Sequence, residues 1–142
     1  MELCFPSVAA PVARNLDTRP TRRWRILVVD DDADFCTVVG ELLRLYAMEV
    51  HKAYSVDEAL DVLDRMTPDL ILTDVMMPGT DGLGLVRRVR EEPSWRSIPT
   101  LVVSARVQQD ERAAAMLAGA DAFIPKPFSL RELRAAIATY LH

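Results

Sequence analysis

Acidic side chains follow two apolar runs of the sequence at the points where the runs end. Asp30 and Asp31 come directly after RILVV, residues 25–29, and Asp74 comes directly after DLILT, residues 69–73. Carboxylates that lie close together repel one another and destabilise a fold unless a cation neutralises them. A small set of oxygen ligands that leaves room for water is typical of Mg²⁺ sites. If the fold brings the two runs together, these residues predict a magnesium site.

Two further residues suit phosphoryl chemistry. Ser104 ends another apolar run, and Lys126 stands out because 15 of the 17 basic residues are arginines and only Lys52 and Lys126 are lysines. A compact ammonium acts as a point charge on a phosphate oxygen, whereas Lys52 is expected at the surface. A carboxylate beside Mg²⁺ and a lysine can attack an activated phosphorus and form an acyl phosphate. Asp74 is the candidate nucleophile.

The sequence lacks the common loops that hold a nucleotide. It contains no GxxxxGK[ST] stretch, and no GxGxxG stretch follows the first apolar run. Both motifs use glycine-rich backbone to hold phosphates at the start of a helix. The phosphoryl group is therefore expected to come from a donor other than ATP.

Some acidic residues beside the candidates have a simpler explanation. Asp31, Asp32 and Asp34 precede or begin a predicted helix, where capping and the helix dipole favour a carboxylate. Asp81 fits a turn before the next helix. Capping accounts for Asp32 or Asp34 without a metal. It does not account for Asp74, which follows a buried strand in the turn-rich stretch TDVMMPGTDG.

Apolar runs alternate with amphipathic stretches along the chain. The predicted strands are RILVV (25–29), EVHKA (49–53), DLILT (69–73), TLVVS (100–104) and DAFI (121–124). Apolar residues recur at helical spacing between and after these runs, first at Phe35, Val38, Val39, Leu42, Leu43 and Tyr46. A repeated strand–helix order predicts an α/β fold, with a parallel sheet covered by helices on both faces.

The composition of the strands predicts their order in the sheet. Residues 25–29, 69–73 and 100–104 are almost wholly apolar, as expected of central strands buried on both faces. EVHKA alternates and DAFI meets Pro125, so these two strands belong at the edges. The resulting order, 2-1-3-4-5, is flavodoxin-like, and ligands of such sheets bind outside the carboxyl ends of the strands. The candidate residues all fall at that edge.

The remaining composition indicates one domain and excludes several kinds of protein. Residues 1–23 are rich in proline, alanine and arginine and predict a poorly ordered basic extension, which leaves 24–142 as the domain. The net charge of −4 argues against a nucleic-acid surface. Cys4 and Cys36 form no disulfide or zinc pattern, which favours a cytoplasmic protein. No apolar run approaches the ~20 residues of a membrane span.

Four stretches resemble the receiver domain of response regulators in order and approximate spacing: ILVVDDD, LILTDVMMPGTDG, LVVSA and AGADAFIPKPF. The resemblance extends from about Arg25 to His142. It implies a phosphorylation-activated switch of a two-component system, which catalyses only its own phosphorylation and dephosphorylation. The implied donor is a phosphohistidine on a sensor histidine kinase or on a histidine phosphotransfer protein.

The resemblance also implies a role for each matching residue. Asp74 would accept the phosphoryl group and bind the metal as well. Asp31 would bind Mg²⁺ directly, and Asp30 would act mainly through a coordinated water. The main-chain carbonyl of Met76 would supply another metal ligand, and the ammonium of Lys126 would hold a phosphoryl oxygen.

A conformational response is implied in the same way. Ser104 matches a hydroxyl that moves toward the bound phosphate, and Phe123 matches an aromatic side chain whose rotamer follows it. Without the resemblance, a serine at a strand end is a local cap and an aromatic residue in a strand is core. The Lys126–Pro127 bond matches a cis peptide bond. The responsive surface would comprise the fourth helix, fifth strand and fifth helix, and it would meet an unknown downstream protein or output domain.

The sequence leaves two other functions open. A receiver-like scaffold would keep the fold but never become phosphorylated, and the complete set of Asp30, Asp31, Asp74, Ser104 and Lys126 argues against it. A haloacid-dehalogenase-like phosphatase also phosphorylates an aspartate after a strand, but it needs a longer chain with a cap. The last helix contains AAIATYLH, whose small and apolar residues suit either a core or a homodimer.

Three features depart from the family pattern. Pro125 stiffens the loop that carries Lys126. Met76 and Arg106 each lie two residues past a site residue, and we predict that they set the lifetime of the acyl phosphate by controlling the access of water. The basic extension is the third feature, and the resemblance assigns it no role.

Overall fold

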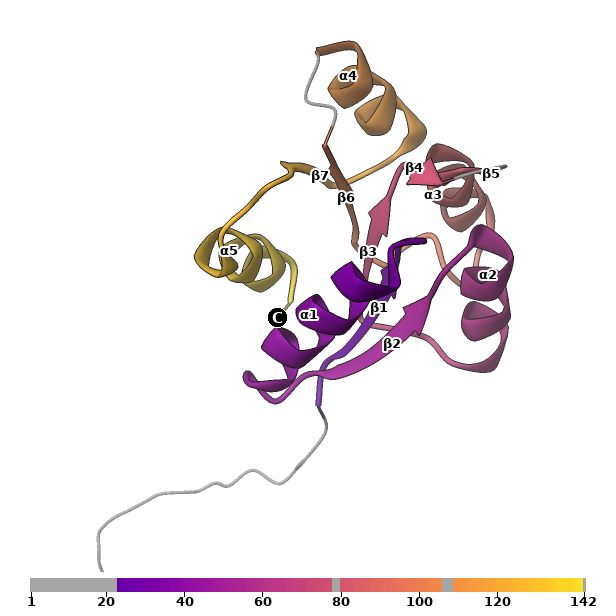
Figure 1. The fold of residues 1–142 in the computed structure, drawn as a ribbon. Helices are drawn as coiled ribbons and strands as arrows, with labels where there is room; N and C mark the ends of the chain where they lie inside the picture. The colour runs from indigo at the N-terminus through magenta and orange to yellow at the C-terminus, as the bar shows by residue number, and fades with distance from the viewer. Residues whose placement is uncertain (1–22, 78–79, 106–108, 142) are drawn as a thin grey trace, which may run out of the picture.

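The computed structural model describes residues 23–77, 80–105 and 109–141, so the predicted extension at 1–23 lies almost wholly outside it. The main sheet consists of β1 (Arg25–Val29), β2 (Glu49–Ala53), β3 (Leu70–Asp74), β6 (Thr100–Ser104) and β7 (Ala122–Pro125). These strands are parallel and lie in the order β2-β1-β3-β6-β7. The predicted flavodoxin-like order is confirmed, because the two strands of mixed composition form the edges (Figure 1).

Helices cover both faces of this sheet. They are α1 (Ala33–Arg44), α2 (Val56–Arg65), α3 (Gly82–Glu91), α4 (Gln109–Ala118) and α5 (Leu130–Tyr140). Helices α1 and α5 share one core cluster with the sheet, whereas α2, α3 and α4 pack against its other face (Figure 1). A short antiparallel pair, β4 (Met76–Met77) and β5 (Thr80–Asp81), follows β3. It was not predicted, because two-residue strands are too short to show a period.

Successive residues of the central strands enter opposite layers of the core. Ile26 and Val28 of β1 pack beneath α1 and α5, whereas Leu27 and Val29 pack beneath α2 and α3. All four side chains are fully buried. Because side chains alternate along a strand, a strand covered on both faces must be apolar throughout. This is why the central strands appear in the sequence as continuous apolar runs.

Polar residues fix the starts of three helices. Asp32, Ser55 and Ser129 cap α1, α2 and α5, and each side chain accepts a hydrogen bond from the backbone N–H three residues further on, at 3.0 to 3.1 Å. Such a cap stabilises a helix by about 1 kcal/mol. The capping explanation of Asp32 therefore holds, and this residue orients the start of α1 directly after the acidic end of β1.

A single arginine fastens the opposite edge of the sheet, where β6 and β7 begin. The Arg90 guanidinium donates to the carbonyl of Gly119 at 2.8 Å, to the carbonyl of Ile98 at 2.8 Å and to the carboxylate of Asp121 at 2.6 Å. Gly119 ends α4 with φ +114°, a conformation that favours glycine. A Cβ atom at this residue would lie 2.6 Å from Cγ of Arg90. Backbone shape and close packing thus both require glycine here.

Two glycines allow a matched test of this joint. We expect Gly119→Ala to lower the free energy of unfolding by about 1–3 kcal/mol, because it combines backbone strain with a clash against Arg90. Gly84→Ala should raise it by up to about 1 kcal/mol, because Gly84 lies inside α3 and an added Cβ there meets nothing within 4 Å. Urea unfolding followed by tryptophan fluorescence measures both, and an equal effect of the two substitutions would contradict this account.

Candidate functional site

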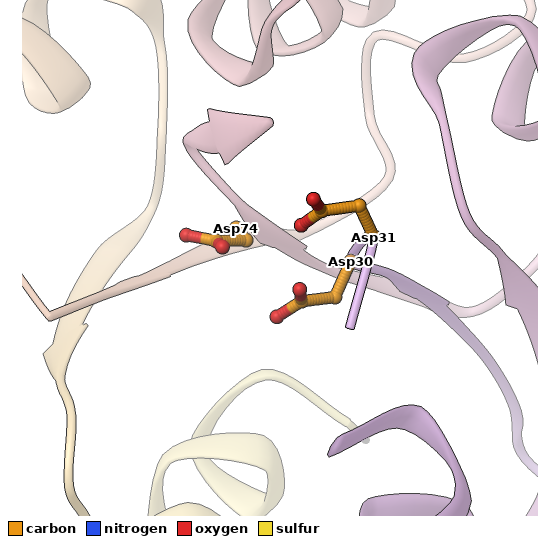
Figure 2. A group of neighbouring side chains, drawn as sticks. All are labelled: Asp30, Asp31 and Asp74. Carbon is orange, nitrogen blue, oxygen red and sulfur yellow. The ribbon is translucent and has the colours of Figure 1, made fainter. Parts of the chain in front are cut away.

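The carboxyl ends of β1 and β3 lie side by side and bring three acidic residues together. The parallel register pairs Val29 with Thr73, so the residues that follow in each strand share one edge of the sheet. One carboxylate oxygen from each of Asp30, Asp31 and Asp74 lies within 4.8 Å of the others. Figure 2 shows the three carboxyl groups projecting into a common space. Asp30 is 1% exposed and Asp74 7%, whereas Asp31 is exposed, so the group is open to solvent from one side.

Hydrogen bonds hold the buried acids in place. Asp30 Oδ1 accepts from the backbone N–H of Asp32 at 3.0 Å, and the thiol of Cys36 donates to the carbonyl of Asp30 at 3.4 Å. The hydroxyl of Thr73 donates to the carbonyl of Asp74 at 3.0 Å. Hydrogen bonds from neighbouring residues of the same chain therefore fix the Asp30 carboxylate and the backbone carbonyls of Asp30 and Asp74. A site built this way is formed before any ligand arrives.

Lys126 brings the positive charge into this group. Its Nζ lies 2.8 Å from Oδ2 of Asp30 and 3.7 Å from Oδ2 of Asp74. The same nitrogen lies 4.0 Å from the centre of the Phe35 ring, and that ring packs edge-on against Phe128 with 6.0 Å between centroids. An ammonium over an aromatic face gains about 0.5–2 kcal/mol according to its exposure. Two carboxylates and one ring thus direct the ammonium toward Asp74.

Ser104 and Phe123 lie on the neighbouring strands. Asp74 pairs with Val103, so Ser104 lies one residue beyond it at the end of β6, where it is fully buried. The carbonyl of Ser104 accepts from the backbone N–H of Lys126 at 2.8 Å, which joins the two chain segments. Phe123 is 8% exposed, and the guanidinium of Arg112 in α4 lies 4.8 Å from the centre of its ring. The Lys126–Pro127 bond is cis, as the resemblance implies.

Comparison with known families matches this arrangement. The family described as response regulator receiver domain matches residues 26–138, which is most of the chain. The chain belongs to the response regulator receiver domains. This match confirms the interpretation of the sequence as a receiver domain. The stretches on which that interpretation was based contain Asp30, Asp31 and Asp74, which form the acidic group.

Similar proteins extend the comparison. The transcriptional regulatory protein TrcR of Mycobacterium tuberculosis is 37% identical over 113 residues, which cover 80% of this chain and 43% of TrcR. The phosphate regulon transcriptional regulatory protein PhoB of Escherichia coli is 37% identical over 113 residues, covering 80% and 49%. The chemotaxis protein CheY4 of Vibrio cholerae superposes with a TM-score of 0.81 at 26% identity, covering 84% of this chain and 100% of that one. The receiver thus spans less than half the length of the two transcriptional regulators.

Family membership narrows the functions left open by the sequence. A receiver domain of a two-component response regulator is a signalling domain and not a conventional enzyme, which argues against the phosphatase alternative. A response regulator implies a partner histidine kinase. Within the stretch that the structure describes, none of the helices combines the length and apolar character needed to cross a membrane.

The structure separates the acidic candidates of the receiver into two groups. Asp30, Asp31 and Asp74 meet with Lys126, whereas Asp34 lies in the first turn of α1 as a helix-start residue. The backbone of Met76 lies in β4, directly after the site. Arg106 and the side chains of Met76 and Asp81 lie outside the described residues, so the prediction for the acyl-phosphate lifetime stays a prediction.

Sequence reasoning missed the part that Phe35 has in the site. Its spacing marked it only as an apolar residue of the helix core, yet its ring lies against the Lys126 ammonium. Its position in the sequence could have indicated this contact. Phe35 lies one helical turn past the N-cap Asp32, and a residue at that position lies beside the end of the preceding strand. Helical periodicity alone does not distinguish a core contact from a contact with a cation.

Cys36 lies beneath the receiver's acidic group and is chemically protected. Burial raises the pKa of its thiol to about 11, and the nearby charge of Asp30 adds to this rise. The side chain is fully buried. Because the thiolate is the reactive form, Cys36 stays protonated and unreactive at neutral pH.

The two lysines allow a matched test of the ion pair in the receiver. We expect Lys126→Met to lower the free energy of unfolding by about 1–3 kcal/mol in EDTA, because it leaves the buried Asp30 without its cation. Lys52→Met on the edge strand β2 should change it by less than about 0.5 kcal/mol. Urea unfolding at pH 7 measures both. If Lys126→Met costs no more than Lys52→Met, the ion pair does not stabilise the fold.

Proposed function

We propose that this receiver domain accepts a phosphoryl group on Asp74, with Mg²⁺ as cofactor, and changes a binding surface in response. The observation that carries the proposal is the meeting of Asp30, Asp31 and Asp74 within 4.8 Å, with Lys126 directed at the same space. The donor is a phosphohistidine of a sensor histidine kinase or of a histidine phosphotransfer protein. Receiver membership and the absence of nucleotide-binding loops in the sequence support this donor.

The donor set fits Mg²⁺ better than a softer metal. The ligands would be the carboxylates of Asp31 and Asp74 together with the main-chain carbonyl that the receiver pattern assigns to Met76; all of them are oxygens, and Asp31 is open to solvent. Both oxygens of Asp30 already have partners, Asp32 and Lys126, which supports a role for Asp30 through a coordinated water. When bound, Mg²⁺ would neutralise these acids and balance charge on the phosphoryl oxygens.

Phosphoryl transfer then needs little beyond positioning. A carboxylate oxygen of Asp74 attacks the phosphorus while the bond from phosphorus to the histidine nitrogen breaks, and the electron pair of that bond stays on the imidazole. Lys126 Nζ lies 3.7 Å from Oδ2 of Asp74, close enough to follow an oxygen of the incoming group. Because Asp74 is only 7% exposed, its surroundings hold the carboxylate and limit the access of water.

The response involves Ser104 and Phe123. The hydroxyl of Ser104 moves toward the phosphoryl group on the adjacent strand, and the rotamer of the buried Phe123 ring follows it. Phe123 packs against α4 with Arg112 over its ring, so a change of its rotamer alters the surface formed by α4, β7 and α5. Phosphate shifts such an equilibrium only through contacts that differ between two states.

This surface meets an unknown downstream protein or output domain, and it also suits a homodimer. Met116 is 46% exposed and Leu117 89%, so α4 offers apolar area to a partner. The domain itself binds neither nucleic acid nor membrane, in keeping with its acidic balance. We place it in the cytoplasm, as residues 24–142 preceded by the basic extension 1–23.

Direct phosphorylation tests the proposal. With acetyl phosphate and Mg²⁺, the intact mass of the wild type should rise by one phosphoryl group, and Asp74→Asn should show no increase. Asp32→Asn is the matched control, because asparagine also caps a helix and Asp32 lies beside the site without belonging to it. Modification that persists in Asp74→Asn sinks the assignment of the acceptor. A wild type that stays unmodified would favour the scaffold alternative.

The lifetime of the acyl phosphate gives a second test. Replacing both Met76 and Arg106 by alanine should speed the loss of the phosphoryl group several-fold, because smaller side chains beside the site admit water more readily. The decay of the phosphorylated mass after removal of acetyl phosphate measures this rate. An unchanged rate would refute the prediction for these two residues, whereas the acceptor test above would stand.

A further inference from the structure

A groove runs along the seam between α1 and α5, which lie next to each other on one face of the sheet (Figure 1). It consists of three hollows of about 470, 510 and 260 Å³. The upper hollow is mostly apolar, and its lining includes Phe35, Val38, Leu42, Phe128 and Leu133 together with Lys126. We call the three hollows together the α1–α5 groove.

The hollows lie next to one another along the chain, and where the middle and lower hollows meet, the guanidinium of Arg134 lies 4.4 Å from the centre of the Tyr46 ring. The upper and middle hollows share Leu130, and the middle and lower hollows share Tyr46 and Arg134. The lower hollow is lined by Trp24, the residue directly before β1. The groove therefore begins where residues 1–23 enter the domain and ends beside Lys126.

The walls of the groove leave apolar surface uncovered. Val38 in α1 is 57% exposed and Tyr46, two residues past the end of α1, is 38% exposed, and each lines one of the hollows. Exposed apolar area of this kind is stabilised when another segment covers it, at roughly 25 cal/mol per Å². The middle hollow is different in character, because Arg131 and Arg134 line it. An occupant should therefore be apolar at one end and carry an acidic residue where it crosses these arginines.

We propose that residues 3–18 of the same chain occupy the α1–α5 groove. The apolar residues of this segment are concentrated in its first part, LCFPSVAAPV at residues 3–12, which would fill the upper hollow. Pro6 and Pro11 favour an extended backbone, which suits a narrow groove. The sole acidic residue between residues 3 and 23 is Asp17, which would face Arg131 and Arg134 in the middle hollow.

Chain length and charge at the entry agree with this path. The ten residues from Ala13 to Arg22 reach up to roughly 33 Å when extended. Helix α5, with its 11 residues, is only about 16 Å long, so the apolar part reaches the upper hollow with chain to spare. At the entry, Glu49 and Asp69 flank Arg25 and offer acidic partners to the arginines that precede it.

The occupied groove would lie against the proposed phosphorylation site, because Phe35 and Lys126 line the upper hollow and also belong to that site. Binding of the segment does not depend on phosphorylation, however. A failure of either proposal therefore leaves the other one standing.

Cys4 supplies a probe within the segment. A nitroxide can be attached to this thiol in the full-length unphosphorylated protein, because Cys36 is buried and its pKa is raised to about 11. Nitroxides weaken the NMR signals of nearby backbone amides. We expect the signals of Val38, Leu42 and Leu130 to lose intensity several-fold relative to the reduced label.

Matched variants separate specific binding from chance approach. Val38→Glu should restore the intensities, because it places a charge in the upper hollow, whereas Leu117→Glu on α4 should not, although Leu117 is the more exposed residue. Val8→Asp in the segment should have the same effect as Val38→Glu without altering the folded domain. The dispersion of the sheet amides verifies folding in each case.

Two results would overturn the inference. The first is an upper hollow whose amides keep full intensity in the labelled wild type. The second is intensity loss that persists when labelled chains without ¹⁵N are mixed with unlabelled ¹⁵N chains, because the segment would then bind a second copy. Intensity loss within one chain that both Val38→Glu and Val8→Asp abolish would establish the contact.

Discussion

The ion pair between Lys126 and Asp30 is the interaction on which the site depends. Asp30 is almost fully buried, and its carboxylate lies in a group with two further acids. Such a group is tolerated only if positive charge is held within its reach, because burial weakens the screening of like charges. Lys126 supplies that charge from the residue directly after β7, a strand that β6 separates from the acidic strands β1 and β3. The sheet order is what makes the pairing geometrically available.

Parallel topology explains why residues far apart in the sequence meet at one edge. The carboxyl ends of β1, β3, β6 and β7 lie together. Each of these strands therefore brings a polar residue to the same place, either as its last residue or as the residue that directly follows it. Apolar side chains fill the strands up to that edge and polar ones begin there. The sheet therefore acts as a frame that fixes the spacing of the acids, and the loops need not do so.

Much of this could be predicted from the sequence, and the exceptions have physical causes. Strand order followed from burial, because RILVV and TLVVS lack the alternation that EVHKA shows. The convergence of Asp30, Asp31, Asp74 and Lys126 followed from topology. The contact of Phe35 with Lys126 could not be foreseen, since it depends on the rotation of α1 about its axis. The β4–β5 pair was missed because it has too few residues to show a pattern.

The amino ends and the carboxyl ends of the strands are each held by a cation, and the two cations differ in kind. At the amino ends, the planar guanidinium of Arg90 makes four directed hydrogen bonds to Gly119, Arg96, Ile98 and Asp121. At the carboxyl ends, Lys126 offers a single rounded ammonium, which tolerates a change of partner far better than a planar fork does. The amino ends of the strands are therefore held rigidly, whereas the contacts of Lys126 at their carboxyl ends can rearrange. A change of partner at the acidic group can then occur without disturbing the opposite end of the sheet.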